Sequence, residues 1–172
     1  MVTIHNPQFD DYLKMHRLVG RIDGLVQHPA HVYKIMCDHF GDSIFLASQK
    51  EPPQTDPVGL MLGIVSRSMH GLLFVWQIGV EKQVQGMGVG SQLLQRTIEY
   101  GRDAGLPGVM ATVETTNTNS QRLFEKNGFE IATEKYQDEY TRISKSTGKP
   151  ALENYYGSGT DQIFYEFLFG QT

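Results

Sequence analysis

Three glycines crowd a short stretch of the chain at which an apolar run gives way to an amphipathic one. Residues 85–91 read Gln-Gly-Met-Gly-Val-Gly-Ser, and the pattern on either side predicts a strand before them and a helix after them. Glycine accepts positive φ angles and lets a ligand approach the backbone closely. The first amides of a helix lack intrahelical acceptors and carry a partial positive charge. The stretch is therefore predicted to form an anion cradle suited to phosphate groups.

Two familiar phosphate-binding motifs do not fit this stretch. A P-loop ends in Gly-Lys-Ser or Gly-Lys-Thr, which is missing here. The dinucleotide fingerprint requires a third glycine or alanine where Ser91 stands, and it follows an early strand rather than one in mid-chain. A glycine-rich turn without any ligand remains the alternative, and the loop by itself favours neither reading.

Cysteine and histidine give weaker signals. Cys37 is the single cysteine, so it has no partner for an internal disulfide, and a buried structural thiol is favoured over a reactive one. The spacing of His28, His31 and His39 matches no zinc pattern, so we expect no metal site.

The elements that must position the cradle follow from apolar spacing, and they indicate an α/β (α+β) fold. Strands are predicted over Val2–Ile4, Ser43–Ser48, Val58–Ser66, Leu72–Val80, Val109–Thr115, Phe129–Tyr136 and Ile163–Phe169; helices over Phe9–Val19, Ala30–Phe40, Gly88–Ala104 and Asn117–Asn127. A polar turn holds Pro52 and Pro53, and residues 137–160 are expected to form a long loop or mobile flap. We expect one domain over residues 1–172.

Composition narrows the class of protein. The formal net charge is −4, which argues against nucleic acid as a partner because such proteins carry a basic face. No apolar run approaches the ~18–20 residues of a membrane span. The first residues also lack the pattern of a secretory signal, so we expect a cytoplasmic protein.

Two motifs together resemble the GNAT superfamily of N-acetyltransferases. Gln85-x-x-Gly88-x-Gly90 is similar to its Gln/Arg-x-x-Gly-x-Gly/Ala signature, and the stretch Asn117–Phe129 looks like its second motif. Either motif is moderate evidence, whereas their order and distance make the pair strong. The resemblance covers nearly the whole chain and implies a central mixed, mostly antiparallel sheet of about seven strands flanked by about four helices.

The resemblance implies acetyl-CoA as cosubstrate, and it implies roles for individual residues. The backbone of Ile78, Gly79 and Val80 would hold the pantetheine arm, and residues 85–91 (Gln85, Gly86, Met87, Gly88, Val89, Gly90 and Ser91) would hold the pyrophosphate. Asn117 and Phe124 would contact the cofactor near its thiol end. Many relatives have a tyrosine at the position of Phe124 that protonates the leaving thiolate, and Tyr155, Tyr156 or water would have to replace it here.

A narrower resemblance points to the diaminobutyrate acetyltransferases of ectoine biosynthesis. It rests on Leu73–Gln77, on Cys37–Phe40 and on Phe124. It implies that Trp76 walls the amine pocket, although core packing is an equal reading. The chain departs from that family at residues 25–29, which replace an acidic, serine-containing segment, and at residues 159–162, where an acidic run is thinned.

The implied reaction is direct attack of a primary amine on the thioester in a ternary complex, which requires a general base. Glu114, near the end of the fifth strand, is the first candidate; its alternatives are Asp38, His39 and Glu81, of which we expect Glu81 to lie in solvent. Glu114 is also compatible with an exposed or ion-paired strand residue.

We expect a small amino-acid-like substrate, with L-2,4-diaminobutyrate as the specific hypothesis. A protein or peptide acetyltransferase and a non-catalytic CoA-binding module remain as alternatives. Relatives are commonly dimers, and the apolar final strand could serve as the interface of a homodimer.

Overall fold

The computed structural model describes residues 2–49, 56–144 and 148–170, so the predicted turn with Pro52 and Pro53 lies outside the described residues. Within them, one sheet has the order β1-β2-β3-β4-β5-β9-β8-β7, and β6 also pairs with β9. The strands are β1 (Thr3–His5), β2 (Ile44–Ser48), β3 (Gly59–Ser66), β4 (Leu72–Val80), β5 (Gly108–Glu114), β6 (Glu130–Ile131), β7 (Ile143–Ser144), β8 (Ala151–Leu152) and β9 (Gln162–Leu168). All pairings are antiparallel except that of β4 with β5.

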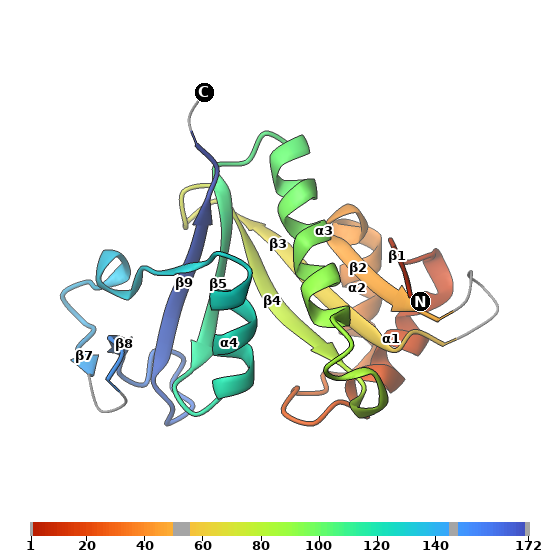
Figure 1. Ribbon diagram of the computed structural model, residues 1–172, viewed down its shortest axis with the longest axis horizontal. Coiled ribbons are helices and arrows are strands. Elements are labelled where there is room, and N and C mark those ends of the chain that lie inside the picture. Colours follow the sequence, from red (N-terminus) through yellow and green to blue (C-terminus); the bar gives the residue numbers. More distant parts are fainter. Residues whose placement is uncertain (1, 50–55, 145–147, 171–172) are drawn as a thin grey trace.

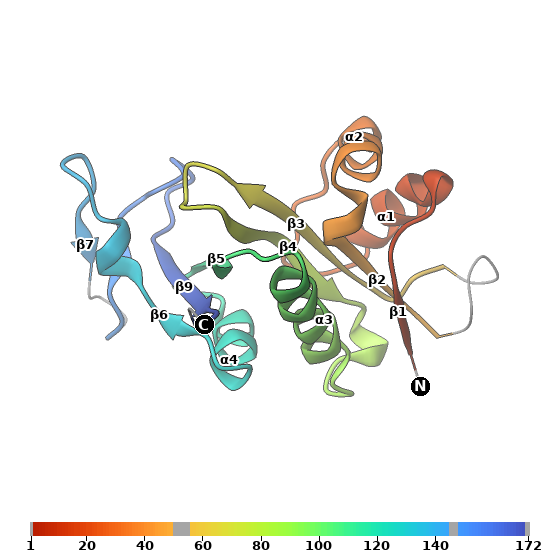
Figure 2. The ribbon, with the colours of Figure 1, turned by 90° about the horizontal axis from the view of Figure 1, so that it is seen from above.

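Four α-helices cover the two faces of this sheet. They are α1 (Tyr12–Val19), α2 (Ala30–Phe40), α3 (Val89–Asp103) and α4 (Thr118–Lys126). Figure 1 shows the elements along the chain, and Figure 2 shows α1 and α2 on one face with α3 and α4 on the other. The predicted mixed, mostly antiparallel fold is confirmed.

Each face of the sheet has its own apolar cluster, because alternate side chains of a strand point to opposite faces. Leu93, Leu94 and Ile98 of α3 pack with Phe124 of α4 on one face. Met15 and Leu18 of α1 and Tyr33 of α2 form the core on the other face. The sheet is thus held from both sides, which fixes the strand ends that line the site.

The chain after α4 differs from its prediction. The strand expected over Phe129–Tyr136 is only Glu130–Ile131, followed by a 3₁₀ turn over Thr133–Tyr136. In that turn the hydroxyl of Thr133 accepts the N–H of Phe164, which ends the β6 pairing with β9. Residues 137–160 are not a plain polar loop, because Ala151 and Leu152 are buried in β8.

The final strand cannot supply a dimer interface in the way we expected. β5 pairs with one edge of β9, whereas β6 and β8 pair with the other. Ile163, Tyr165, Phe167 and Phe169 alternate onto the α3–α4 face, as predicted, and pack within the core. The apolar character of β9 therefore comes from its interior position.

Cys37 has a structural environment. Its Sγ lies 3.5 Å from Sδ of Met15, and the side chain packs against the core under α1 and α2. Burial, with smaller contributions from the carboxylates of Asp11 and Asp38, raises the pKa of the thiol to about 11. The thiol is therefore protonated at neutral pH, which agrees with the structural reading.

Candidate functional site

The site begins where β4 and β5 separate. These parallel strands pair only over Leu73–Val75 and Val109–Ala111, so among the described residues no strand pairs with that edge of β4 beyond Val75 (Figure 1). The register between β3 and β4 also shifts there, because Leu62 pairs with Gln77 and Gly63 with Val75. Trp76 is the extra residue, and such bulges often re-aim side chains next to active sites.

The bulge gives two consecutive side chains the same direction. Val75 and Ile78 pack on the α3–α4 face, whereas Trp76 packs against the core under α1 and α2. Gln77 also turns to that side, since its Nε2 donates to the carbonyl of Val26 in the loop between α1 and α2 (2.8 Å).

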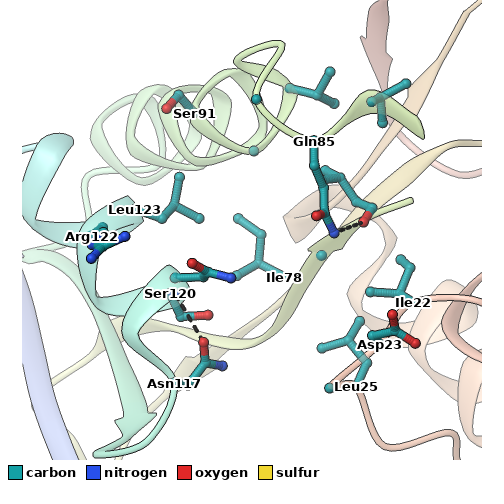
Figure 3. A pocket seen from close by; sticks show the side chains of 18 of the residues that line it. Ile22, Asp23, Leu25, Ile78, Gln85, Ser91, Asn117, Ser120, Arg122 and Leu123 are labelled. Carbon is teal, nitrogen blue, oxygen red and sulfur yellow. Dashed lines mark hydrogen bonds between the residues drawn. The ribbon is translucent and has the colours of Figure 1, made fainter. Parts of the chain in front are cut away.

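The first cavity, of about 460 Å³, opens beside the free edge of β4. Figure 3 shows Ile78 between two walls, with Asn117 (the N-cap of α4) and Ser120 and Leu123 of α4 on one side and Ile22 and Leu25 on the other. Most of the predicted cofactor residues line it: Ile78, Gly79, Val80, Gln85, Gly86, Gly88, Val89, Gly90, Ser91 and Asn117. A strand edge and a helix start therefore face one space.

The cradle itself has the expected backbone. Gly86 and Gly88 have φ angles of 76° and 81°, and Gly88 is the N-cap of α3. Within the described residues, the amides of Gly88, Val89 and Gly90 have no acceptor. These N–H groups at the positive end of a helix remain free for an anion.

Met87 and Phe124 lie elsewhere than predicted. Met87 does not line the first cavity: its side chain is 66% exposed, and its amide donates to the carbonyl of Val84 (3.3 Å). Met87 lies between two glycines with positive φ angles, and its side chain points into solvent although it is apolar. Phe124 is buried, stacks on Tyr165, and lines the second cavity rather than the first.

Sequence reasoning missed several lining residues. Arg122 and Lys126 of α4 line the first cavity, four residues apart and hence on one helix face. They bring positive charge to the cavity that the residues of the cradle also line. Their spacing was a usable signal, whereas the loop residues Ile22–Leu25, which also line the cavity, have no pattern of their own.

The second cavity, of about 440 Å³, adjoins the first along a shared rim. The residues common to both are Gly24, Leu25, Ile78, Asn117 and Ser120. Trp76 and Glu114 line only the second cavity, so the structure brings together the two residues predicted for catalysis. Trp76 packs on the core and also lines this cavity.

Glu114 differs from the other base candidates in its position. It is exposed at the end of β5, and its Oε1 accepts a hydrogen bond from the hydroxyl of Thr160 (3.2 Å). Asp38 forms an ion pair with Lys34, and neither Asp38 nor His39 lines a cavity.

Glu81 is also excluded as a base. It forms an ion pair with Arg21 (2.6 Å) and does not lie free in solvent as we expected. The side chain lines neither cavity, so its charge serves to hold the end of β4 to the segment after α1.

The two tyrosines that are candidates for the acid differ in position, because only Tyr156 lines a cavity. Tyr155 packs edge-on against Phe164 and lines neither cavity. Tyr156 lines the second cavity, and its hydroxyl lies 3.1 Å from Oγ1 of Thr112. Desolvation raises the pKa of Tyr156, with a smaller opposing effect from the bond with Thr112, so this phenol keeps its proton at neutral pH.

Three bonds hold the loop between α1 and α2 over the second cavity. Besides the bond from Gln77 to Val26, the amide of His28 donates to the hydroxyl of Tyr33 (3.1 Å), and Gln27 Nε2 donates to the carbonyl of His16 (2.7 Å). The His28 ring stacks on Trp76 with centroids 5.0 Å apart. His28 lines the second cavity.

Among the described residues, no three histidine, cysteine or acidic side chains are grouped so that they could hold a metal ion. No helix in that part of the chain is both long and apolar enough to cross a membrane.

Comparison with known proteins places this arrangement in a family. The sequence profile of the acetyltransferase (GNAT) family matches residues 10–129. L-2,4-diaminobutyric acid acetyltransferase from Halalkalibacterium halodurans is 32% identical over 133 residues, which cover 77% of this chain and 68% of that protein. The enzyme of the same name from Halomonas elongata is 25% identical over 163 residues, covering 93% and 83% of the two chains.

Solved structures share the fold at lower identity. Diaminobutyrate acetyltransferase from Paenibacillus lautus, in complex with L-2,4-diaminobutyric acid and coenzyme A, superposes with a TM-score of 0.74 at 20% identity and covers 100% of this chain and 98% of its own. The NatC complex bound to Gag peptide and CoA gives the same TM-score at 14% identity, covering 98% and 99%. Cradle, adjoining cavities and family profile agree, and the chain belongs to the acetyltransferase (GNAT) family.

Proposed function

We propose that the chain is an acetyl-CoA-dependent N-acetyltransferase acting on a primary amine of a small amino-acid-like substrate, with L-2,4-diaminobutyrate as the first candidate. The observation that carries the proposal is a cavity that contains the free-amide cradle and shares a rim with a second cavity of about 440 Å³. The similarity to L-2,4-diaminobutyric acid acetyltransferases supports the choice of amine.

The residues of the first cavity fit coenzyme A. Free amides at the start of α3 suit the pyrophosphate, Arg122 and Lys126 add positive charge, and the unpaired edge of β4 from Ile78 to Val80 suits the amide groups of pantetheine. The cosubstrate supplies an acetyl group activated as a thioester. Everything else in the reaction is assigned to side chains of this chain.

In the proposed mechanism, the amine enters the second cavity and attacks at the shared rim. Its nitrogen lone pair forms the new C–N bond and the C–S bond breaks. Glu114 accepts the proton that the neutral amine loses, and Tyr156 donates its phenolic proton to the departing thiolate. The proton on Glu114 then passes through solvent to Tyr156, which restores both side chains. Holding the two reactants together supplies up to ~7–11 kcal/mol of the barrier in ideal cases.

A thiol-release assay with acetyl-CoA tests the function. The amines are L-2,4-diaminobutyrate, lysine, spermidine and a short peptide. We expect release of CoA with diaminobutyrate and little with the peptide, because Tyr156 and Ser158 wall the second cavity. If the protein binds CoA but releases no CoA thiol from acetyl-CoA with any of these amines, a non-catalytic binding module is favoured instead.

The variant Tyr156→Phe is expected to lower kcat by about 10²-fold, the lower end of the range for loss of a positioned acid. The KM for acetyl-CoA should stay within about twofold, since Tyr156 does not line the first cavity. Tyr155→Phe is the matched control, because its ring lies in the apolar cluster and lines neither cavity. Equal kcat values for wild type and Tyr156→Phe would remove Tyr156 as the acid.

A single domain, a cytoplasmic location and a homodimer are also part of the proposal. The dimer is expected because relatives in the family are commonly dimers. A surface other than β9 would have to form its interface.

A further inference from the structure

Most polar side chains that line the second cavity already take part in hydrogen bonds within the protein. The described lining of this cavity contains no lysine or arginine. One N–H of the Gln77 amide donates to Val26, and one N–H of the Gln162 amide donates to Thr160. The remaining hydroxyls are shared in pairs, Thr112 with Tyr156 and Ser158 with Thr160. Asn117 and Ser120 line the first cavity as well, so they belong to the rim.

Two ring donors that line only the second cavity have no hydrogen-bond partner at all in the described residues, and they belong to one stacked pair. Neither the indole N–H of Trp76 nor the imidazole of His28 has a hydrogen-bond partner in the described part of the chain. Imidazole has at least one N–H in either protonation state, and indole has one. The rings stack 5.0 Å apart with planes inclined by 30°, so both donors lie in the same wall.

Hydrogen bonds of the loop between α1 and α2 hold His28 in place. Its own amide is bonded to Tyr33, and neighbouring residues of the loop are tied by Gln77 and Gln27. Glu114, the cavity's one carboxylate in the described lining, comes from β5, on another wall. The cavity therefore has an acidic group and a group of ring donors on different elements.

We infer that His28, stacked on Trp76, recognises the carboxylate of an amino-acid substrate by donating a ring N–H to it. This inference rests on the proposed function and names the acid group as the feature that the pocket selects. An amine without a carboxylate leaves the His28 donor unpaired, so it is a poorer substrate. His28 is thus a specificity-determining residue and takes no proton from the reacting amine.

The test compares two diamines that differ by a carboxylate, L-2,4-diaminobutyrate and 1,3-diaminopropane. His28→Phe keeps an aromatic ring for Trp76 but has no N–H. The ratio of kcat/KM for diaminobutyrate to that for diaminopropane is expected to fall by about 10- to 100-fold, as for loss of a hydrogen bond to a charged group. His31→Phe is the matched control: His31 is exposed on α2 and lines neither cavity, so it should keep the wild-type ratio.

A second variant separates the donor from the ring. His28→Gln retains an N–H and should recover part of the ratio, and if His28→Phe does not fold, His28→Leu against His28→Gln gives the same comparison. If His28→Phe or His28→Leu keeps the wild-type ratio of the two kcat/KM values, the inference is overturned while the proposed function stands. This holds whether the rates with both diamines fall or neither rate falls. Wild-type protein that acetylates neither diamine overturns L-2,4-diaminobutyrate as the substrate and the inference with it.

Discussion

The variant Gly88→Val is expected to raise the KM for acetyl-CoA by about 10- to 100-fold. Gly88 has a φ of 81° as the N-cap of α3, a conformation that a β-branched residue rarely adopts. No atom lies within 4 Å of a Cβ placed there, so the effect comes from backbone strain and not from a clash inside the protein. Strain of ~1–3 kcal/mol shifts the first amides of α3, which we propose to hold the pyrophosphate.

Gly105→Val is the matched control for this variant. Gly105 follows the other end of α3 with a φ of 67°, also has open space around a Cβ, and lines neither cavity. Both variants should lose similar thermal stability, but only Gly88→Val should weaken binding of acetyl-CoA in calorimetry. Unchanged affinity in Gly88→Val would refute the cradle, and with it the proposed cofactor.

Glu114→Gln should lower kcat by about 10²- to 10⁴-fold, the range for loss of a general base. The substitution keeps the shape of the side chain and an oxygen that can accept from Thr160, so the cavity wall should persist. The KM for acetyl-CoA should change little, because Glu114 lines only the second cavity.

Glu130→Gln provides the comparison for Glu114. Glu130 is an exposed carboxylate on the short strand β6 and lines neither cavity. Steady-state rates of thiol release at saturating amine and acetyl-CoA measure both variants. If Glu114→Gln kept the wild-type kcat at every pH tested, proton transfer would have to be assigned to another group.

Local patterns in the sequence predicted those helices and strands in which the spacing of apolar residues shows which side chains are buried. The periodic spacing in α2 gave its bounds, Ala30–Phe40, without error, and β4 was predicted over the same residues that form it. The glycines around residue 88 predicted a helix start because their backbone requirement is local. Burial of Ala151 and Leu152 was not foreseen, since it depends on β9, which follows later in the chain.

The candidate site divides in the same way. The residues of the cradle could be predicted because they are contiguous, with Met87 as the exception. His28 and Tyr156 reach the second cavity from segments far apart in the chain, and nothing in the local pattern of either segment indicates that they meet there. Only the sheet, which joins β4 to β5 and β5 to β9, brings those segments together.

The extra residue at Trp76 also decides which deletions this strand tolerates. Val75 and Ile78 face one core while Trp76 and Gln77 face the other side, so removing either Trp76 or Gln77 would restore simple alternation and leave both ends of β4 on their present faces. In a regular strand the loss of one residue would turn one end over. A single-codon deletion at this point would therefore remove one side chain from the wall of the second cavity, while the edge of β4 beside the cradle keeps its place.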